Sequence, residues 1–214
     1  MPLPINEHFV TIQGEAEFTG TPSLFIRVQG CPVGCHWCDT KHTWEVDPQF
    51  KVESVSTKIE DSETYQEMNT ADLLKLIGYA KVKHIVFTGG EPALYDLKEI
   101  SSTLIDLGYS VQLETSGTHE IEIDPRAWVT VSPKFDMKGG FEVLKSCLER
   151  ANEIKMPIGK KSDLDKVMPL TAFGKRIWLQ PLSQNNSATK LCIEAAIEHN
   201  FGLSVQTHKY LDIR

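Results

Sequence analysis

Short apolar or β-branched runs alternate with segments of helical periodicity along most of this chain. The runs expected to be strands cover residues 23–28, 84–88, 110–114, 128–131, 153–155, 176–180 and 203–207. Apolar residues recur at helical spacing over 70–80, 96–107 and 187–200, with Asn69 or Thr70 and then Ser187 as expected N-caps. Strands that alternate with helices favour parallel βα units, so the pattern predicts an α/β fold.

Small, hydroxyl-bearing or charged residues follow four of these expected strands. They occupy residues 88–92, 114–117, 132–134 and 180–182. The carboxyl ends of parallel strands meet at one edge of a sheet, and ligands bind there in α/β folds. We therefore expect the four segments to form a shared rim around one ligand.

The charge and the distribution of apolar residues predict one cytoplasmic domain over residues 1–214. The formal charge is −7, which gives no general attraction to nucleic acid or to an anionic membrane surface. No segment approaches the roughly 20 apolar residues of a membrane helix, and residues 1–7 lack the features of a signal peptide. Residues 45–68 are polar with little periodicity, and we interpret them as an inserted surface segment.

Three of the five cysteines, Cys31, Cys35 and Cys38, fall within eight residues of each other. Clustered thiolates suit a zinc ion or an iron–sulfur cluster. Structural zinc takes four ligands, and His36 or His42 could supply the fourth, whereas a cluster on three cysteines keeps one iron open. The spacing favours the cluster and leaves zinc possible. The remaining two, Cys147 and Cys192, lie on the apolar stripes of expected helices, as buried thiols do.

The cysteine loop is followed by Thr88-Gly89-Gly90-Glu91-Pro92, directly after an expected strand. The two motifs together resemble the radical S-adenosylmethionine (SAM) superfamily. Nearly the whole chain, in order, further resembles the 7-carboxy-7-deazaguanine synthase family, most of all its branch from enteric bacteria. The segments that carry this resemblance are residues 11–15, 25–27, 35–44, 113–118, 130–134, 179–181 and 206–211.

The resemblance implies an architecture and a reaction. The expected fold is a trimmed partial (β/α) barrel of the radical SAM type, with a cluster loop at 30–40 and a polar insert at about 45–68. The expected reaction is the radical ring contraction of 6-carboxy-5,6,7,8-tetrahydropterin to 7-carboxy-7-deazaguanine with loss of ammonia, in 7-deazapurine (queuosine) biosynthesis. This makes the protein a carbon–nitrogen lyase in which SAM is regenerated.

The resemblance also assigns residues to the site. A [4Fe–4S] cluster is expected on Cys31, Cys35 and Cys38, and Mg²⁺ on Thr40, whose hydroxyl is a hard oxygen ligand. SAM is expected to contact Trp37, Cys38, Asp39, Gly90, Ser132, Pro133, Lys134 and Gln180, with Glu91, Glu114 and Ser116 close by. The substrate is expected against Ile12, Gln13, Gly14, Glu15, Arg27, Thr88 and His208. The radical step needs no residue as acid or base.

The sequence also predicts partners for the protein and leaves two alternative functions. The chain carries a single cluster-sized set of cysteines, so an external flavodoxin- or ferredoxin-type electron donor is expected, and the family implies a homodimer. A glycyl-radical-activating enzyme and a non-catalytic zinc module with three cysteines and one histidine are the alternatives.

Family members commonly have Gly where this chain has Ala16. A positive φ there would cost Ala about 1 kcal/mol.

Overall fold

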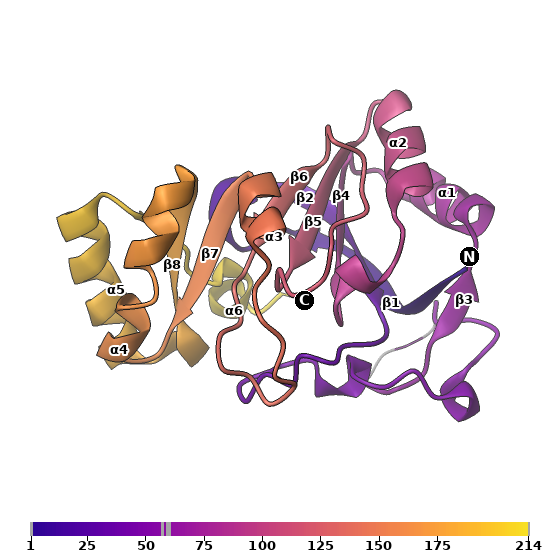
Figure 1. The fold of residues 1–214 in the computed structure, drawn as a ribbon. Coiled ribbons are helices and arrows are strands. Elements are labelled where there is room, and N and C mark those ends of the chain that lie inside the picture. The colour runs from indigo at the N-terminus through magenta and orange to yellow at the C-terminus, as the bar shows by residue number, and fades with distance from the viewer. Residues whose placement is uncertain (1, 57, 59–60, 214) are drawn as a thin grey trace.

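One curved sheet forms the centre of the molecule (Figure 1). The computed structural model describes residues 2–56, 58 and 61–213. Within these residues the sheet has nine strands in the order β3-β1-β2-β4-β5-β6-β7-β8-β9. β1 is antiparallel to β2 and β3, and the pairs from β2 to β9 are parallel, as the alternating pattern predicted. The architecture is thus a mixed α/β sheet consistent with a partial barrel.

The strands occupy short and mostly buried segments. Their bounds are β1 Leu3–Ile12, β2 Pro22–Val28, β3 Gln66–Met68, β4 His84–Gly89, β5 Ser110–Thr115, β6 Trp128–Val131, β7 Glu153–Ile158, β8 Arg176–Pro181 and β9 Gly202–Leu203. The sequence analysis did not predict β1 or β3. These are the antiparallel strands, and they lie outside the βα repeat from which the other strands were recognised.

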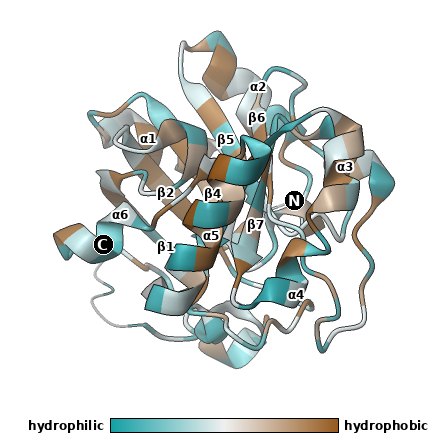
Figure 2. Ribbon diagram, turned by 90° about the vertical axis from the view of Figure 1, so that its left-hand side faces the viewer, coloured by the Kyte–Doolittle hydropathy of each residue, from teal (hydrophilic) through white to brown (hydrophobic). Residues whose placement is uncertain are grey.

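Helices surround the strands on the outer side of the curve (Figures 1 and 2). The α-helices are α1 Thr70–Tyr79, α2 Lys98–Asp106, α3 Lys145–Arg150, α4 Lys161–Leu164, α5 Asn186–His199 and α6 Thr207–Leu211. Short 3₁₀ helices occupy Ala16–Phe18, Lys41–Thr43, Pro48–Phe50, Pro92–Leu94, Met168–Phe173 and Leu182–Gln184. None of the helices within the described ranges is long and apolar enough to span a membrane.

Alternation along the strands separates an apolar layer from a polar one. On β5, Val111 and Leu113 belong to the hydrophobic core, whereas Gln112 and Glu114, which alternate with them, form polar hydrogen bonds. Successive side chains of a strand point to opposite faces. The outer face packs against the helices, and the inner face carries the polar groups that reach the site.

Three sequence expectations need correction. Asn185, not Ser187, caps α5, because its side chain accepts hydrogen bonds from the backbone N–H groups of Ser187 and Ala188. The strand expected at 203–207 is only Gly202–Leu203, since α6 begins at Thr207.

The insert at 45–68 is also more than a surface segment. Val55, Tyr65 and Met68 are buried, and β3 pairs with β1 at the sheet edge. A few apolar residues anchor an otherwise polar stretch, which periodicity alone does not detect. Residues 57, 59 and 60 of this prediction lie outside the described residues.

Candidate active site

A cavity of about 480 Å³ lies at the carboxyl ends of the parallel strands. The four polar segments that follow β4, β5, β6 and β8 all contribute to its lining, which confirms the predicted shared rim. The cavity brings together nearly all of the site residues predicted from sequence: Ile12, Gln13, Gly14, Glu15, Arg27, Cys31, Cys35, Trp37, Cys38, Asp39, Thr40, Thr88, Gly90, Ser132, Lys134, Gln180 and His208. Pro133 is buried and is not among its lining residues.

The cysteine loop enters the cavity directly after β2. Gly30 and Gly34 have φ values of 97° and 67°, so both occupy the left-handed region that the tight turns of this loop require. The N–H groups of Gly30 and Cys31 donate to the carbonyls of Thr43 and Trp44, at 2.7 and 2.9 Å. These bonds fasten the start of the loop to the chain that follows it.

The three thiols suit a cluster better than a single zinc ion. Cys31, Cys35 and Cys38 gather on a small apolar group formed with Val33 and Met137. Sulfurs around one tetrahedral zinc would lie about 3.8 Å apart, given a Zn–S distance of about 2.3 Å. Among the residues that the structure describes, the three sulfurs do not form a group whose members all lie within 4.8 Å of one another. At least two of these sulfurs therefore lie farther apart than the ligands of one zinc ion do.

Among the described residues, neither His36 nor His42 forms a group of close metal ligands with the three cysteines. His42 instead lies with the carboxylates of Glu7 and Asp61, their ligand atoms all within 4.8 Å of one another. Burial is the main cause that raises the pKa of the Cys31 thiol to about 12, with smaller contributions from Glu91, Cys35 and Cys38. Three thiolates at this position therefore favour a strongly cationic group that binds them.

The Gly-Gly-Glu-Pro segment lies directly against the cysteine loop. A Cβ atom on Gly90 would come 2.2 Å from the carbonyl oxygen of Gly30, so only glycine allows this approach. The Glu91 N–H donates to the same carbonyl at 2.8 Å. The Glu91 carboxylate, 1% exposed, accepts hydrogen bonds from the Thr115 hydroxyl at 2.6 Å and from the Ser116 N–H at 2.9 Å. Glu91 thereby joins the ends of β4 and β5.

The segment after β6 contributes a buried cation. The Lys134 ammonium donates to the Ser132 carbonyl at 3.0 Å and to its hydroxyl at 2.5 Å. Burial lowers the pKa of Lys134, while the thiol of Cys35 acts in the opposite direction. On the other side of the cysteine loop, Trp37 is 39% exposed and Asp39 is exposed, so both can meet a ligand without rearrangement.

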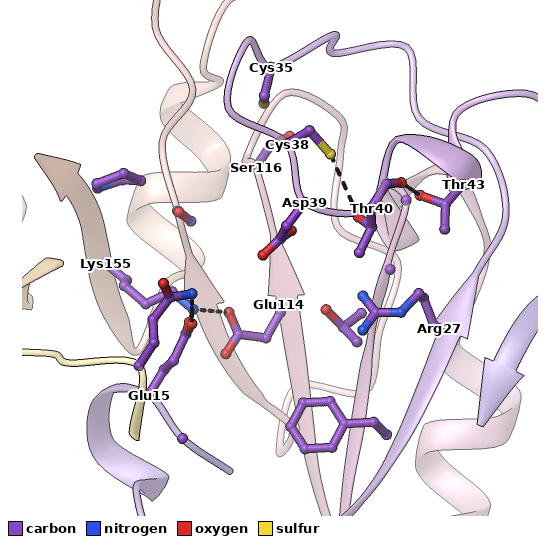
Figure 3. Close-up of a pocket in the computed structure, with 18 of the residues that line it drawn as sticks. Glu15, Arg27, Cys35, Cys38, Asp39, Thr40, Thr43, Glu114, Ser116 and Lys155 are labelled. Carbon is purple, nitrogen blue, oxygen red and sulfur yellow. Dashed lines mark hydrogen bonds and ion pairs between the residues drawn. The ribbon is translucent and has the colours of Figure 1, made fainter. Parts of the chain in front are cut away.

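Thr40 lies where the cysteine loop meets the next 3₁₀ helix. Its hydroxyl is 3.6 Å from the Cys38 sulfur, and its carbonyl accepts from the Thr43 hydroxyl at 2.7 Å (Figure 3). The Thr40 hydroxyl is half-buried at the cavity wall. A ligand could therefore reach this oxygen from within the cavity.

The wall opposite the cysteines is polar. Arg27 on β2 lies beside Thr88 on β4 in the parallel register, and its Nε donates to Glu7 Oε1 at 2.7 Å. The His208 ring packs over Gly14, where an added Cβ would come 2.3 Å from Nδ1. Burial lowers the pKa of His208, which favours the neutral ring. Figure 3 shows Glu15 and Arg27 at the two ends of this polar wall, with Cys35 and Cys38 above them.

The Gln13 side chain has its hydrogen bonds within the protein. Its Nε2 lies 3.1 Å from Gln112 Oε1 and 3.3 Å from Glu114 Oε1, and its Oε1 accepts from the Glu15 N–H. Only 3% of the residue is exposed. The side chain therefore supports the loop, and the sequence analysis did not foresee this use.

Lys155 on β7 is a cavity residue that the sequence analysis missed. Its ammonium lies 2.5 Å from Glu15 Oε2 and 2.6 Å from Glu114 Oε2 (Figure 3). A signal was present, because Lys155 is a charged residue at the centre of a strand whose other members are mostly apolar. A charge on a buried strand requires partners, which here are two carboxylates on distant segments.

Glu15 and Glu114 respond differently to this shared cation. Burial acts to raise the pKa of Glu15, but the attraction and hydrogen bond of Lys155 outweigh it and lower the pKa to about 2. For Glu114 burial prevails and raises the pKa, with the charge of Glu15 adding to the effect. Lys155, although buried, has its pKa raised by the two carboxylates. Glu15 thus stays ionised at neutral pH.

Ala16 occupies a position at which members of the family that the sequence resembles commonly have Gly, and its backbone is left-handed. Its φ is 53°, in the left-handed region, and its N–H donates to the Ser204 hydroxyl at 2.9 Å. The residue begins the 3₁₀ helix directly after Glu15. The expected strain on alanine is therefore present at the cavity edge.

Comparison with known proteins indicates the same family as the sequence motifs do. The family model of the radical SAM superfamily matches residues 25–127. The chain is 50% identical to the 7-carboxy-7-deazaguanine synthase of Escherichia coli K12 and 46% identical to that of Buchnera aphidicola, with complete coverage of both proteins in each case. The crystal structure of QueE from Escherichia coli superposes with a TM-score of 0.93 at 49% identity, covering 96% of this chain and 94% of that one. The chain is an enzyme that belongs to the 7-carboxy-7-deazaguanine synthase family of the radical SAM superfamily.

Proposed function

We propose that this protein converts 6-carboxy-5,6,7,8-tetrahydropterin to 7-carboxy-7-deazaguanine, with loss of ammonia, in queuosine biosynthesis. The observation that carries the proposal is one cavity shared by three thiols, the Gly90 strand end and the polar wall of Glu15 and Arg27. The printed names of full-length relatives at 50% and 46% identity support the same reaction.

The chain's own residues divide into two groups in this proposal. Cys31, Cys35 and Cys38 would hold a [4Fe–4S] cluster, as membership of the radical SAM superfamily implies. The segments at 37–39, Gly90, 132–134 and Gln180 would hold SAM. When bound, the cluster and SAM would supply the radical chemistry that removes a hydrogen atom from C6 of the substrate.

The polar wall would bind and orient the substrate. The Arg27 guanidinium suits a carboxylate, and Glu15, ionised and buried, suits the N–H groups of a pterin edge. Ile12, Gly14, Thr88 and His208 would complete the wall, and Gln13 would act through the loop it supports. The protein's task is to hold C6 toward the cysteine side and to exclude water, so no side chain is assigned as acid or base.

Several finer features belong to the same proposal. Residues 1–214 would act as a single radical SAM domain, in the cytoplasm and as a homodimer. A flavodoxin- or ferredoxin-type protein would deliver the electron. Pro133, buried behind the cavity wall, would act only by shaping the segment between Ser132 and Lys134.

Thr40 would contribute its hydroxyl to Mg²⁺ at the substrate carboxylate. Hydroxyl oxygen is a hard ligand of the kind that Mg²⁺ accepts beside water and substrate. Turnover with and without Mg²⁺ tests this assignment. Thr40→Val should lose the magnesium dependence, and an unchanged dependence in Thr40→Val would remove Thr40 from the site.

The main test is turnover after anaerobic reconstitution with iron and sulfide. The protein is mixed with SAM, dithionite, Mg²⁺ and 6-carboxytetrahydropterin, and products are read by mass spectrometry. The proposal expects 7-carboxy-7-deazaguanine. Formation of 5′-deoxyadenosine with the pterin unchanged would retain the superfamily and refute the substrate, whereas bound zinc without SAM cleavage would favour the zinc module.

A further inference from the structure

Lys155 occupies an unusual position for a lysine. Its side chain is 6% exposed, and every residue of β7 is buried. A buried ammonium is stable only where charged or polar partners replace water. Lys155 therefore depends on Glu15 and Glu114 as its charge partners. The two carboxylates in turn share Lys155 as their cation.

The three residues come from three separate elements. Glu15 follows β1, Glu114 lies on β5 and Lys155 lies on β7. The ammonium bridges one oxygen of each carboxylate, at 2.5 and 2.6 Å (Figure 3). Lys155 thus links the loop after β1 to both β5 and β7 through charged groups.

The other oxygen of each carboxylate is held by side-chain amides. Glu15 Oε1 accepts from Gln206 at 2.8 Å and from Gln180 at 3.3 Å. Glu114 Oε1 lies 3.1 Å from Gln112 Nε2 and accepts from it. The two carboxylates and one ammonium together carry a charge of −1, and Lys155 is what separates two like charges.

We propose that Lys155 is a positioning residue for substrate binding, which fixes the Glu15 carboxylate on the cavity wall. This inference rests on the proposed function, since Glu15 is assigned to the substrate there. Lys155 acts on the substrate through Glu15. Its loss should therefore change substrate binding, whereas the loss of a residue that only stabilises the fold should not.

The backbone around Glu15 is anchored independently of Lys155. The Thr207 N–H donates to the Gly14 carbonyl at 3.0 Å, and the Ala16 N–H donates to the Ser204 hydroxyl at 2.9 Å. These bonds hold the loop on both sides of Glu15. Removal of the ammonium should therefore release the Glu15 side chain while the loop remains in place.

The experiment uses variants that separate charge balance from positioning. Lys155→Met changes the formal charge of the group from −1 to −2, and the double variant Lys155→Met/Glu114→Gln restores a formal charge of −1 without the bridge. The reconstituted enzyme is assayed for KM and kcat with 6-carboxytetrahydropterin and for KM with SAM. Equilibrium dialysis with 6-carboxypterin, a non-reacting analogue, measures binding without turnover.

We expect Lys155→Met to raise the KM for the pterin at least about tenfold and to weaken 6-carboxypterin binding in parallel, because a buried charge partner is lost. The KM for SAM should not change. The double variant should regain the resistance to urea of the wild type but keep the raised pterin KM. If Lys155→Met does not fold, the double variant alone decides.

Recovery of the wild-type pterin KM in the double variant would overturn the proposal, since Lys155 would then only balance charge. A folded Lys155→Met with unchanged KM would overturn it as well. Lys166→Met is the matched control, because Lys166 forms an exposed ion pair with Asp136, and its KM should stay unchanged. If the wild type itself does not convert the pterin, the proposed function fails before this inference is tested.

Discussion

The two walls of the cavity are built in different ways. The cysteine wall is a loop that follows β2, and its three thiols gather on Val33 and Met137. The opposite wall is fixed by a charged group, in which Lys155 on β7 lies between Glu15 and Glu114. The cysteine wall is shaped to bind a metal group, whereas the polar wall is already organised by the protein alone.

This difference has a consequence for how each wall responds to change. Substitution in the cysteine wall should remove the chemistry and leave the fold, because few core contacts depend on the thiols. Substitution in the polar wall should change substrate binding and stability together.

Cys35→Ala should abolish turnover. A cluster on three cysteines loses one of its ligands, so iron content and product should both fall to background while the unfolding transition is retained. Iron analysis and mass spectrometry provide the measurement. Cys192→Ala, a buried cysteine of α5, is the control and should keep its iron. Equal iron in both variants would contradict the assignment of the cysteine wall.

Glu91→Gln should lower the free energy of unfolding by about 2 kcal/mol, because a buried carboxylate loses charge-assisted hydrogen bonds from Thr115 and Ser116. Urea unfolding of the protein without its cluster measures this effect. Glu120→Gln, whose carboxylate contacts Ser146 at the surface, should change it by less than about 0.5 kcal/mol. Similar values for the two variants would show that Glu91 does not fasten the two strand ends.

The buried pair of His84 and Gln112 should make the free energy of unfolding depend on pH. Burial lowers the pKa of His84 below its ordinary value of 6.5, and the neutral ring lies 2.9 Å from Gln112 Oε1. The unfolded chain then binds more protons below this value, so the stabilising contribution is present above about pH 6.5 and is lost as the pH falls. His84→Gln should flatten the slope of unfolding free energy between pH 7 and pH 5. Parallel slopes would contradict the prediction.

Ala16→Gly should have the smallest effect and a stabilising sign. Glycine relieves the strain at a φ of 53°, and loss of a buried methyl group offsets part of the gain, which leaves at most about 1 kcal/mol. Ala71→Gly, at an exposed position of α1, should instead lose about 0.5 kcal/mol. Thermal unfolding of both variants provides the measurement, and the same sign in both would remove the argument from strain.

The sequence predicted the parallel part of the fold well because its signals are local. The strands β4, β5, β6 and β8 are short apolar runs, each followed by a polar segment. The rim of the cavity follows from the common direction of these strands. β1 and β3 were missed because their pairing is antiparallel and depends on contacts across the sheet. The burial of Tyr65 in the insert likewise depends on what the segment packs against.

The site shows the same limit. The cysteines, Gly90 and Arg27 stand in motifs that a reader of the sequence can find. Lys155 lies 140 residues from Glu15, and only the fold brings them together. The side chain of Gln13 could be assigned to the wall, but its engagement with Gln112 could not be foreseen from spacing.

A crystal structure of the reconstituted protein with SAM and 6-carboxytetrahydropterin tests the contrast between the two walls most directly. We predict a [4Fe–4S] cluster on Cys31, Cys35 and Cys38, with the pterin against Glu15 and Arg27 and the Lys155 bridge unchanged. A zinc ion on the cysteines, or a pterin bound away from Glu15, would contradict the account.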